Sequence, residues 1–484
     1  MSAISHRLLR SGVLNLPRPS PGCKPITESL LLKDAQAHHC FFRAAGLHNH
    51  LSHHILAAYD LGATSSLLQK IYDDEASDQR PIILEDQDKN MKVNTKSWKQ
   101  YVGNQNAYNG FFHFFQERIE ATGVSETLGE YIFSPAANEP GLNMLVRLMS
   151  GAAHPFIQIG YGLEFGNDFL VATGLAQTAV TNPLTTTIFN YKPALTQTNG
   201  TSNGTKSILE LLREVYDSPK LKPVPYDSNA LISARIKDAL RDGGAEEVQR
   251  ISSQLQVDEN VTEAEVNEKI EEYIWTAVLL LFATGKEGHK PRLDFFLMHI
   301  VTSSLFLKSY VSVLQNPLHK AQLLRAYLPV IILLTLSRGR PKINAELIMK
   351  ASDKVRPPLH PPEKLYQNDK TSIGNPIQDE DYNPWPALIE ASLYAPDSHV
   401  LKTMRTLVYA AREYGDTQPG QVAGAYRSGR DEETHPGMAK VDGSLFVRAA
   451  GVLMDYMGWT THGQVAGNWD RSALGWEEAW LDEE

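Results

Sequence analysis

Between Leu293 and Leu307 the chain reads LDFFLMHIVTSSLFL. Apolar residues occupy almost every face that a helix would present over this stretch. A helix that is hydrophobic all round has to be buried, because no face of it suits water. The sequence therefore predicts a helix over Leu293–Leu314 in the interior of a large helical core.

Helical signals extend from this stretch in both directions, and the alternation typical of strands is scarce. Pro81–Glu85 is the best short strand candidate. No helix-and-loop unit recurs at a fixed spacing, which argues against a solenoid. We predict an all-α fold, with further helices over Thr27–Gln36, Gly46–Leu61, Ser97–Ala121, Leu142–Ser150, Ser207–Val215, Ala230–Arg241, Glu263–Phe282, Lys320–Ser337, Asp397–Tyr414 and Ser444–Met457.

The domain organisation that we expect is one large helical domain over residues 26–484, with a buried polar site and long loops. Residues 1–25 are expected to form a disordered tail. Residues 197–262 are expected to be a polar surface excursion, because they begin with the turn-rich QTNGTSNGTK and continue into an acidic stretch. Pro357–Pro386 and Asp416–Gly443 are predicted to be long loops, which often form lids in enzymes.

Composition excludes several classes of protein. The net charge of −10 lacks the cationic excess on which phosphate-backbone binding depends, so we expect no nucleic-acid partner. Two cysteines, Cys23 and Cys40, cannot build a disulfide framework, which favours a reducing, cytoplasmic location. The longest apolar runs are interrupted well before the ~20 residues that cross a bilayer, so no membrane span is predicted.

Four histidines gather in HNHLSHHILAAYDLGA, which begins at His48. His54 flanks the apolar stripe of the predicted helix, His50 lies farther along the same edge, and His53 lies well outside it. A spacing of i,i+4 allows His50 and His54 to reach one metal ion. The alternative is a hydrogen-bonded core histidine with surface neighbours.

Two further histidines lie in apolar surroundings. His154 precedes Pro155, which places it at the N-cap of a helix, where the positive helix end keeps the imidazole neutral and able to bind a metal. Simple capping explains this position equally well. His299 is the imidazole of the buried helix, where a structural hydrogen bond is the ordinary role.

His399 and Lys402 are i,i+3 neighbours that follow Asp397, a suitable N-cap. Both project away from the apolar stripe of their helix. Periodicity alone therefore places the pair either in solvent or on the wall of a polar cavity.

Nucleotide-binding signals are weak. GYGLEFG at Gly160–Gly166 has the wrong spacing for a dinucleotide fingerprint and follows no convincing strand. No Walker A loop, GxSxG elbow or paired CxxC occurs. If the protein performs redox chemistry, a metal or the substrate itself has to provide the route to oxygen.

Four segments in order resemble the questin oxidase-like family of fungal and bacterial proteins. They start at His48, His154, Asp294 and Asn383 and read HNHLSHHILAAYDLGA, HPFIQIGYGLEF, DFFLMHIVTSSLF and NPWPALIEASLYAPDSHVLKTMRTL. The resemblance extends from about Ser29 to the C-terminus. It implies an oxygenase that opens a ring of an anthraquinone-type polyketide with O2.

The resemblance also implies a site, which for at least one relative is a mononuclear non-heme iron held by four histidines and a carboxylated lysine. Carried over to this chain, the Fe(2+) ligands would be one or two of the helix histidines, with His50 and His54 preferred to His53, then His154, His299 and His399, with Lys402 as the modified lysine. His154, Lys402 and Gln158 are the expected catalytic residues; Gln158 stands where the family commonly has a second histidine. Proximity to these motifs suggests an aromatic substrate pocket of Tyr161, Phe295, Phe296 and Trp385.

Three other functions are weighed against the iron oxygenase. A metal-free, Baeyer–Villiger-type monooxygenase would use NADPH to reduce the quinone before oxygen attacks it. A metal-dependent hydrolase is the second alternative, because histidine-rich helical proteins also host zinc or manganese. The third is a non-catalytic helical protein that binds a partner. Buried polar rings disfavour it, because they destabilise a fold unless they are used.

Overall fold

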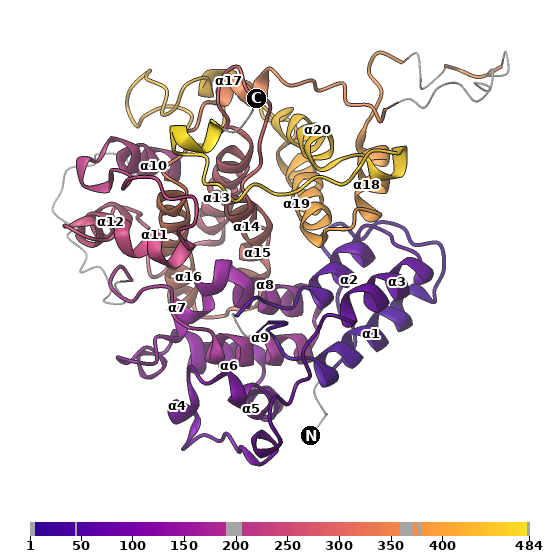
Figure 1. The fold of residues 1–484 in the computed structure, drawn as a ribbon, viewed down its shortest axis with the longest axis vertical. Coiled ribbons are helices and arrows are strands. Elements are labelled where there is room, and N and C mark those ends of the chain that lie inside the picture. Colours follow the sequence, from indigo (N-terminus) through magenta and orange to yellow (C-terminus); the bar gives the residue numbers. More distant parts are fainter. Residues whose placement is uncertain (1–4, 44–45, 190–205, 359–370, 375–378, 482–484) are drawn as a thin grey trace.

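The computed structural model describes residues 5–43, 46–189, 206–358, 371–374 and 379–481. Within these ranges there are helices and isolated β-bridges but no β-strand, so the predicted all-α class is confirmed (Figure 1). Pro81–Glu85 is not a strand: Pro81 makes only a single bridge to His38. The longer helices are α1 (Cys23–Ala37), α2 (Leu51–Asp60), α3 (Ser65–Ala76), α5 (Tyr108–Thr122), α8 (Ser150–Phe165), α9 (Asp168–Val180), α10 (Ile208–Asp217), α11 (Ile232–Ala239), α12 (Gly244–Ser252), α13 (Glu263–Phe282), α14 (Phe295–Ser304), α15 (Phe306–Val313), α16 (Pro317–Ser337), α18 (Trp385–Leu393), α19 (Ser398–Tyr414) and α20 (Leu445–Met457).

The core is built around α8, which packs against α9, α14 and α15. Close packing of α8 on α9 depends on glycine: a Cβ at Gly162 would lie 2.7 Å from Val171, and one at Gly174 would lie 2.5 Å from Ile159. The predicted helix Leu293–Leu314 is present as α14 and α15, which meet at Leu305. His299 therefore lies in the interior, as expected of an all-apolar helix.

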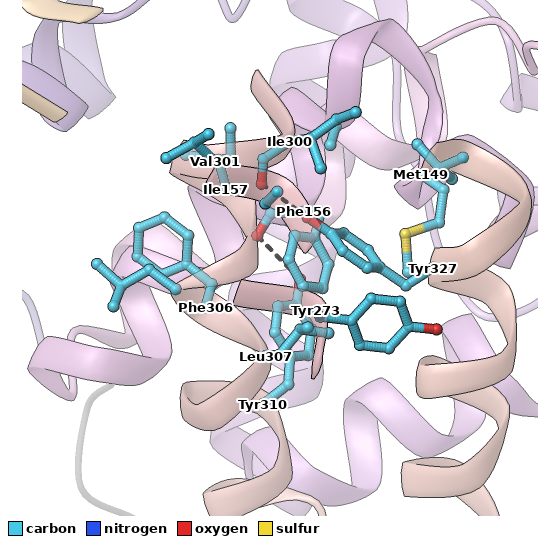
Figure 2. Close-up of a cluster of buried hydrophobic side chains, with 14 of the residues drawn as sticks. Met149, Phe156, Ile157, Tyr273, Ile300, Val301, Phe306, Leu307, Tyr310 and Tyr327 are labelled. Carbon is cyan, nitrogen blue, oxygen red and sulfur yellow. Dashed lines mark hydrogen bonds between the residues drawn. The ribbon is translucent and has the colours of Figure 1, made fainter. Parts of the chain in front are cut away.

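Aromatic side chains join α14 and α15 to α8 and α16 by ring packing and hydrogen bonds (Figure 2). Phe156 and Tyr310 stack with their ring centroids 4.4 Å apart, and the Tyr310 hydroxyl donates to the Phe156 carbonyl at 3.2 Å. The Tyr327 hydroxyl donates to the Ile300 carbonyl at 3.1 Å. These bonds satisfy the hydroxyls of buried tyrosines and fix the position of α14, which carries His299.

The N-terminal helices α1–α3, in indigo and violet in Figure 1, pack together at one side of the molecule and contribute to the same core. α2 packs against α1, α3, α8 and α19, and all ten of its residues are buried. This explains why an amphipathic stripe is a poor guide to α2: every face of it meets protein. α19, in turn, contacts α2, α14, α18 and α20.

The predicted disordered tail at residues 1–25 differs from the structure, in which residues 5–22 lie against α2, α8 and α9 before α1 begins at Cys23. The Leu8 side chain is buried, and the Val13 amide donates to Glu164 at 2.7 Å. The Asn15 amide donates to Asp60 at 2.7 Å. Buried carboxylates that need donors thus hold a segment whose composition suggests disorder.

The predicted polar excursion at residues 197–262 differs likewise. Residues 197–205 lie outside the described residues, but 206–262 contain α10, α11 and α12. α10 buries five side chains and packs against α12, α13 and α16, so it belongs to the core. Of the predicted loops, Asp416–Gly443 contains only a short 3-10 turn, while much of Pro357–Pro386 lies outside the described residues.

Within the described part of the chain, two segments are long and apolar enough to pass a length-and-composition test for a membrane span, Phe295–Val313 and Pro317–Ser337. In each, most of the apolar window is buried inside the protein, 78% and 83% respectively. Such burial is what core helices require, and the all-round apolar character of α14 and α16 has this explanation within the fold.

Candidate metal and substrate site

Four histidines from four separate segments meet where α2, α8, α14 and α19 come together. Each of these helices contacts two of the others, α2 with α8 and α19, and α14 with the same pair. His50, His154, His299 and His399 each offer a ring nitrogen, and these nitrogens all lie within 4.8 Å of one another. The sequence motifs are therefore brought to one place by the packing of the helices that carry them.

His50 and His154 form the closest pair, with their Nε2 atoms 2.7 Å apart. His50 is the N-cap of α2, and its carbonyl accepts from the His54 amide at 2.9 Å. His154 follows a break in α8, where Gly151, Ala152 and Ala153 adopt left-handed φ values of 58°, 53° and 62°. Regular helix resumes at His154, within one residue of the predicted start, which had His154 as the N-cap.

His299 and His399 are oriented by hydrogen bonds at the ring nitrogen that faces away from the cluster. The Nδ1 of His299 lies 2.8 Å from the Phe295 carbonyl, and that of His399 lies 2.7 Å from the Asp397 carboxylate. In both residues Nε2 is buried and has no hydrogen-bond partner. A ring held at Nδ1 with a free Nε2 is the arrangement that metal-binding histidines adopt.

Burial keeps all four rings neutral. It lowers the pKa of His50, His154 and His299 well below the usual value, and that of His399 to about 4. Desolvation is the largest cause in each case, because the charged imidazolium loses its hydration. At neutral pH the rings thus retain the lone pairs that a metal requires.

Lys402 lies one turn beyond His399 on α19 and is 2% exposed. Its Nζ is buried and without a hydrogen-bond partner. Burial lowers its pKa to about 8, with Asp397 and Glu75 acting in the opposite direction. Of the two placements that periodicity left open for His399 and Lys402, the structure adopts the interior one.

A cavity of about 820 Å³ opens beside the histidines. This volume suits a small organic ligand, and its wall is largely apolar. His50, His154 and His399 contribute to that wall, so the cluster borders the cavity. Its other lining residues are Phe42, Gly46, Leu47, His48, Glu75, Met149, Gly151, Ala152, Leu184, Ile232, Phe295, Phe296, Val330, Leu334, Pro396, Asp397, Ser398, Ala466, Gly467, Asn468 and Arg471.

The other two candidate histidines of α2, His53 and His54, are both buried and lie outside the group of four. The Nδ1 of His54 lies 2.5 Å from Glu75, and His54 does not belong to the group of four. His53, predicted to lie well outside the apolar stripe, is fully buried, with its ring centroid 6.0 Å from that of His50. His50 and His54 keep the i,i+4 backbone hydrogen bond, but their rings have different partners, His154 for His50 and Glu75 for His54.

The remaining candidates divide between the cavity and its surroundings. Phe295 and Phe296 line the cavity, as expected of substrate contacts, whereas Tyr161 and Trp385 do not. Tyr161 is buried behind the cluster, where it stacks on His53 at 5.3 Å. The Gln158 amide accepts a hydrogen bond from Ser52 and donates one to Thr173, each at 2.9 Å. It lines a different, much smaller cavity.

His48, Glu75 and Arg471 are cavity residues that the sequence reasoning did not select. His48 stacks on His154 with centroids 4.5 Å apart, and its buried Nε2 has no partner. Its membership of the histidine-rich motif was the available signal. Glu75 and Arg471 lie in segments without any recognisable motif, so only the fold brings them to the site.

The fold and site together define an all-helical protein with a buried histidine cluster at the wall of an apolar cavity. The sequence profile of the questin oxidase-like family matches residues 47–407, and the chain belongs to this family. The matched range contains all four clustered histidines and Lys402.

Relatives of known name support this assignment. The chain is 31% identical to a Baeyer-Villiger monooxygenase of Cryptosporiopsis sp. (62% of this chain, 66% of the relative) and 31% identical to a Baeyer-Villiger oxidase of Pestalotiopsis fici (60% and 64%). It is 30% identical to a questin oxidase of Aspergillus fumigatus (64% and 68%). The similarity thus spans about two thirds of the length of these relatives.

Proposed function

We propose that the protein is an oxygenase that opens a ring of an anthraquinone-type polyketide by C–C bond cleavage, using O2 at a mononuclear non-heme iron. The observation that carries the proposal is the convergence of four neutral imidazoles, three of them on the wall of an apolar cavity, beside a buried lysine without a hydrogen-bond partner. The names of the relatives, questin oxidase and Baeyer-Villiger oxidase, support the ring-opening chemistry.

The donor set fits iron. The Nε2 atoms of His299 and His399 are buried without partners, which is destabilising unless something binds them. Ligands at adjacent positions around a metal, about 2.1 Å from it, are about 3 Å apart, close to the 2.7 Å between the Nε2 atoms of His50 and His154. Imidazole nitrogens with an oxygen ligand suit Fe(2+).

Lys402 would provide that oxygen ligand after adding carbon dioxide. A neutral amine forms an N–C bond to carbon dioxide and releases one proton from nitrogen, and the resulting carbamate is anionic and offers an oxygen atom. Two features of Lys402 support this role: its Nζ lacks any partner in its buried position, and burial lowers its pKa to about 8, so the neutral amine is accessible near neutral pH.

The protein's own part in the reaction is to bind and orient the substrate and to exclude water. Phe295 and Phe296 present aromatic rings to a planar substrate, and the Phe295 ring contacts both His299 at 4.8 Å and His399 at 5.2 Å. The unpaired Nε2 of His48 can hydrogen-bond a hydroxyl or carbonyl group of the substrate. When bound, iron would supply the route by which triplet O2 reacts with a closed-shell substrate, and positive charge for the developing anion.

The test combines metal content with oxygen consumption, on protein purified without chelator and without a His-tag. We expect about one iron per chain, and O2 uptake with a hydroxyanthraquinone substrate that needs no NADPH. His299→Ala should lose both metal and turnover. His113→Ala, at an exposed histidine of α5, is the matched control and should lose neither.

Three results would contradict the proposal, and two of them would each favour an alternative function. Turnover at trace iron that depends on NADPH would favour the metal-free monooxygenase. Turnover without O2 uptake would favour a hydrolase. Unchanged metal content and turnover in His299→Ala would show that the cluster is not the site.

A further inference from the structure

Arg471 lies on the cavity wall with its guanidinium over the face of Phe295, the Cζ atom 4.1 Å from the ring centroid. It is the one Lys or Arg among the described residues that line the cavity. The other charged lining residues are acids with partners: Glu75 pairs with His54, and Asp397 pairs with His399.

No ion pair or hydrogen bond engages the Arg471 side chain among the described residues. This distinguishes it from the arginines around it. Arg292 binds Asp470, and Arg338 is buried against Asp294. Arg471 is an exposed residue at the edge of the cavity, and without a carboxylate partner its donors are available to a ligand.

The backbone that carries Arg471 is fixed to the start of α14. The Asp470 amide donates to the Leu293 carbonyl at 2.8 Å, and the Phe295 amide donates to the Asp470 carbonyl at 2.8 Å. The Asp470 carboxylate accepts from Arg292 as well. Arg471 is therefore held on a supported segment beside Phe295, which reduces the entropy lost when it binds a ligand.

Phe295 links Arg471 to the histidine cluster. Its ring touches the guanidinium and also the rings of His299 and His399. A planar molecule that lies along Phe295 in the cavity would thus reach the cation at one end and the histidines at the other.

We propose that Arg471 binds an anionic oxygen of an aromatic substrate, either a carboxylate or an ionised phenol, and so determines which end of the substrate faces the histidine cluster. The planar guanidinium is suited to such an oxygen, because it donates two parallel hydrogen bonds to a carboxylate. This inference rests on the proposed function for the kind of substrate, and it adds the charge that the substrate carries.

The experiment measures equilibrium binding by calorimetry at pH 7.5, under anaerobic conditions so that no turnover intervenes. The probes are anthraquinone-2-carboxylate and the neutral anthraquinone-2-carboxamide. We expect the carboxylate to bind the wild-type protein about tenfold more tightly than the amide, and Arg471→Gln to abolish that difference while amide binding stays the same. Arg430→Gln, at an exposed arginine in the loop before α20, is the matched control.

Equal affinity for the two probes in the wild-type protein, or a carboxylate preference that survives in Arg471→Gln, would overturn the inference. A hydroxyanthraquinone distinguishes the two anion sources. An Arg471-dependent gain that appears only above the pKa of its phenol assigns an ionised phenol, whereas a gain with the carboxylate alone assigns a carboxylate. Because these measurements need neither metal loading nor turnover, their failure is separate from a failure of the oxygenase proposal.

Discussion

At the residue scale, Lys402 is the side chain whose surroundings least resemble those of an ordinary surface lysine. Its amine is buried among neutral imidazoles with no hydrogen-bond partner. An apolar side chain of similar shape would satisfy the fold better, since burying an unpaired polar group costs about 1–3 kcal/mol. The proposed role of Lys402 as a metal ligand would account for an amine at this position.

Lys402→Met should keep the thermal midpoint unchanged or raise it, because it removes the unpaired amine, and it should reduce iron content and turnover at least tenfold. Scanning calorimetry measures the thermal midpoint, and metal analysis with an activity assay measures iron content and turnover. Lys308→Met, at a partly exposed lysine of α15, is the control. A variant with a clearly lower midpoint and full turnover would assign Lys402 to stability instead.

His435 offers a prediction about pH away from the site. Burial lowers its pKa to about 3, and both ring nitrogens lack partners. Because the folded pKa lies below the unfolded value of about 6.5, the contribution to stability is complete above pH 6.5 and is lost as the pH falls toward 3. At pH 5 the loss is about 2 kcal/mol.

His435→Phe removes this titration, so the variant should lose less stability than the wild type between pH 7.5 and pH 5. Urea midpoints at the two pH values give the comparison. The wild type carries other buried histidines, and the difference between the two proteins isolates His435. If the wild type and His435→Phe lost equal stability between pH 7.5 and pH 5, the His435 ring would not contribute to the loss of stability at acidic pH.

For single residues, the sequence predicted features that depend on chain neighbours alone, such as helix caps and helix starts. Asp397 caps α19 through the His399 amide at 2.8 Å, and His154 starts a regular helical stretch, as predicted. It did not predict the orientation of side chains that is set by packing against other helices. His54 turns to Glu75, and His53 is buried against Tyr161, because α2 is covered on every side.

At the scale of elements, the left-handed break before α8 sets the position of His154. Ala152 at a φ of 53° is strained, whereas glycine accepts that conformation. Ala152→Gly should raise the free energy of unfolding by about 0.5–1 kcal/mol after allowance for the greater freedom of glycine in the unfolded chain.

Gly151→Ala should act in the opposite direction. A Cβ there would lie 2.4 Å from Cε1 of His48, in addition to the strain of a positive φ. We expect a loss of about 1–3 kcal/mol and a displaced His48 ring. Chemical denaturation of the two variants side by side checks the opposite signs, and changes of the same sign would contradict the account of this break.

Arg405 joins three of the helices that carry site residues. It lies on α19 and pairs with Asp60 of α2 at 2.8 Å and with Glu164 of α8, all three side chains being buried. Arg405→Met leaves two buried carboxylates without their cation and should destabilise the protein by about 3–5 kcal/mol.

The corresponding measurement is the thermal midpoint, which should fall by several degrees in Arg405→Met. Arg412→Met, which breaks an exposed pair with Glu413 on the same helix, should shift it far less because exposed ion pairs contribute little. Similar midpoints for the two variants would mean that the buried network does not hold the helices together.

Helices were predicted correctly where a segment has a clear capping signal and a helical pattern of apolar residues. α13 begins and ends where predicted, at Glu263 and Phe282, because Thr262 forms a capping box and an apolar run follows. α3, α9, α12 and α18 were missed; α9 is buried over nearly its whole length, so it lacks the polar face that marks an amphipathic helix. The predicted helix Ser97–Ala121 is interrupted at Gly103, which has a φ of 87°.

At the scale of the whole molecule, the all-α class followed from local patterns, but the arrangement of the helices did not. The four histidines span His50 to His399 in the chain, and only long-range packing brings them together. The same holds for the N-terminal segment, whose amides bind the buried carboxylates of Asp60 and Glu164. Family resemblance anticipated the cluster because it carries information about packing that periodicity lacks.

The central claim is that His50, His154, His299 and His399, together with Lys402, hold one iron. Anomalous diffraction at the iron edge, from crystals of untagged protein prepared without chelator, tests it most directly. We predict a single strong peak among the four Nε2 atoms, with continuous density from the Lys402 amine toward it. A map with no peak there, from protein that turns over its substrate, would contradict the claim.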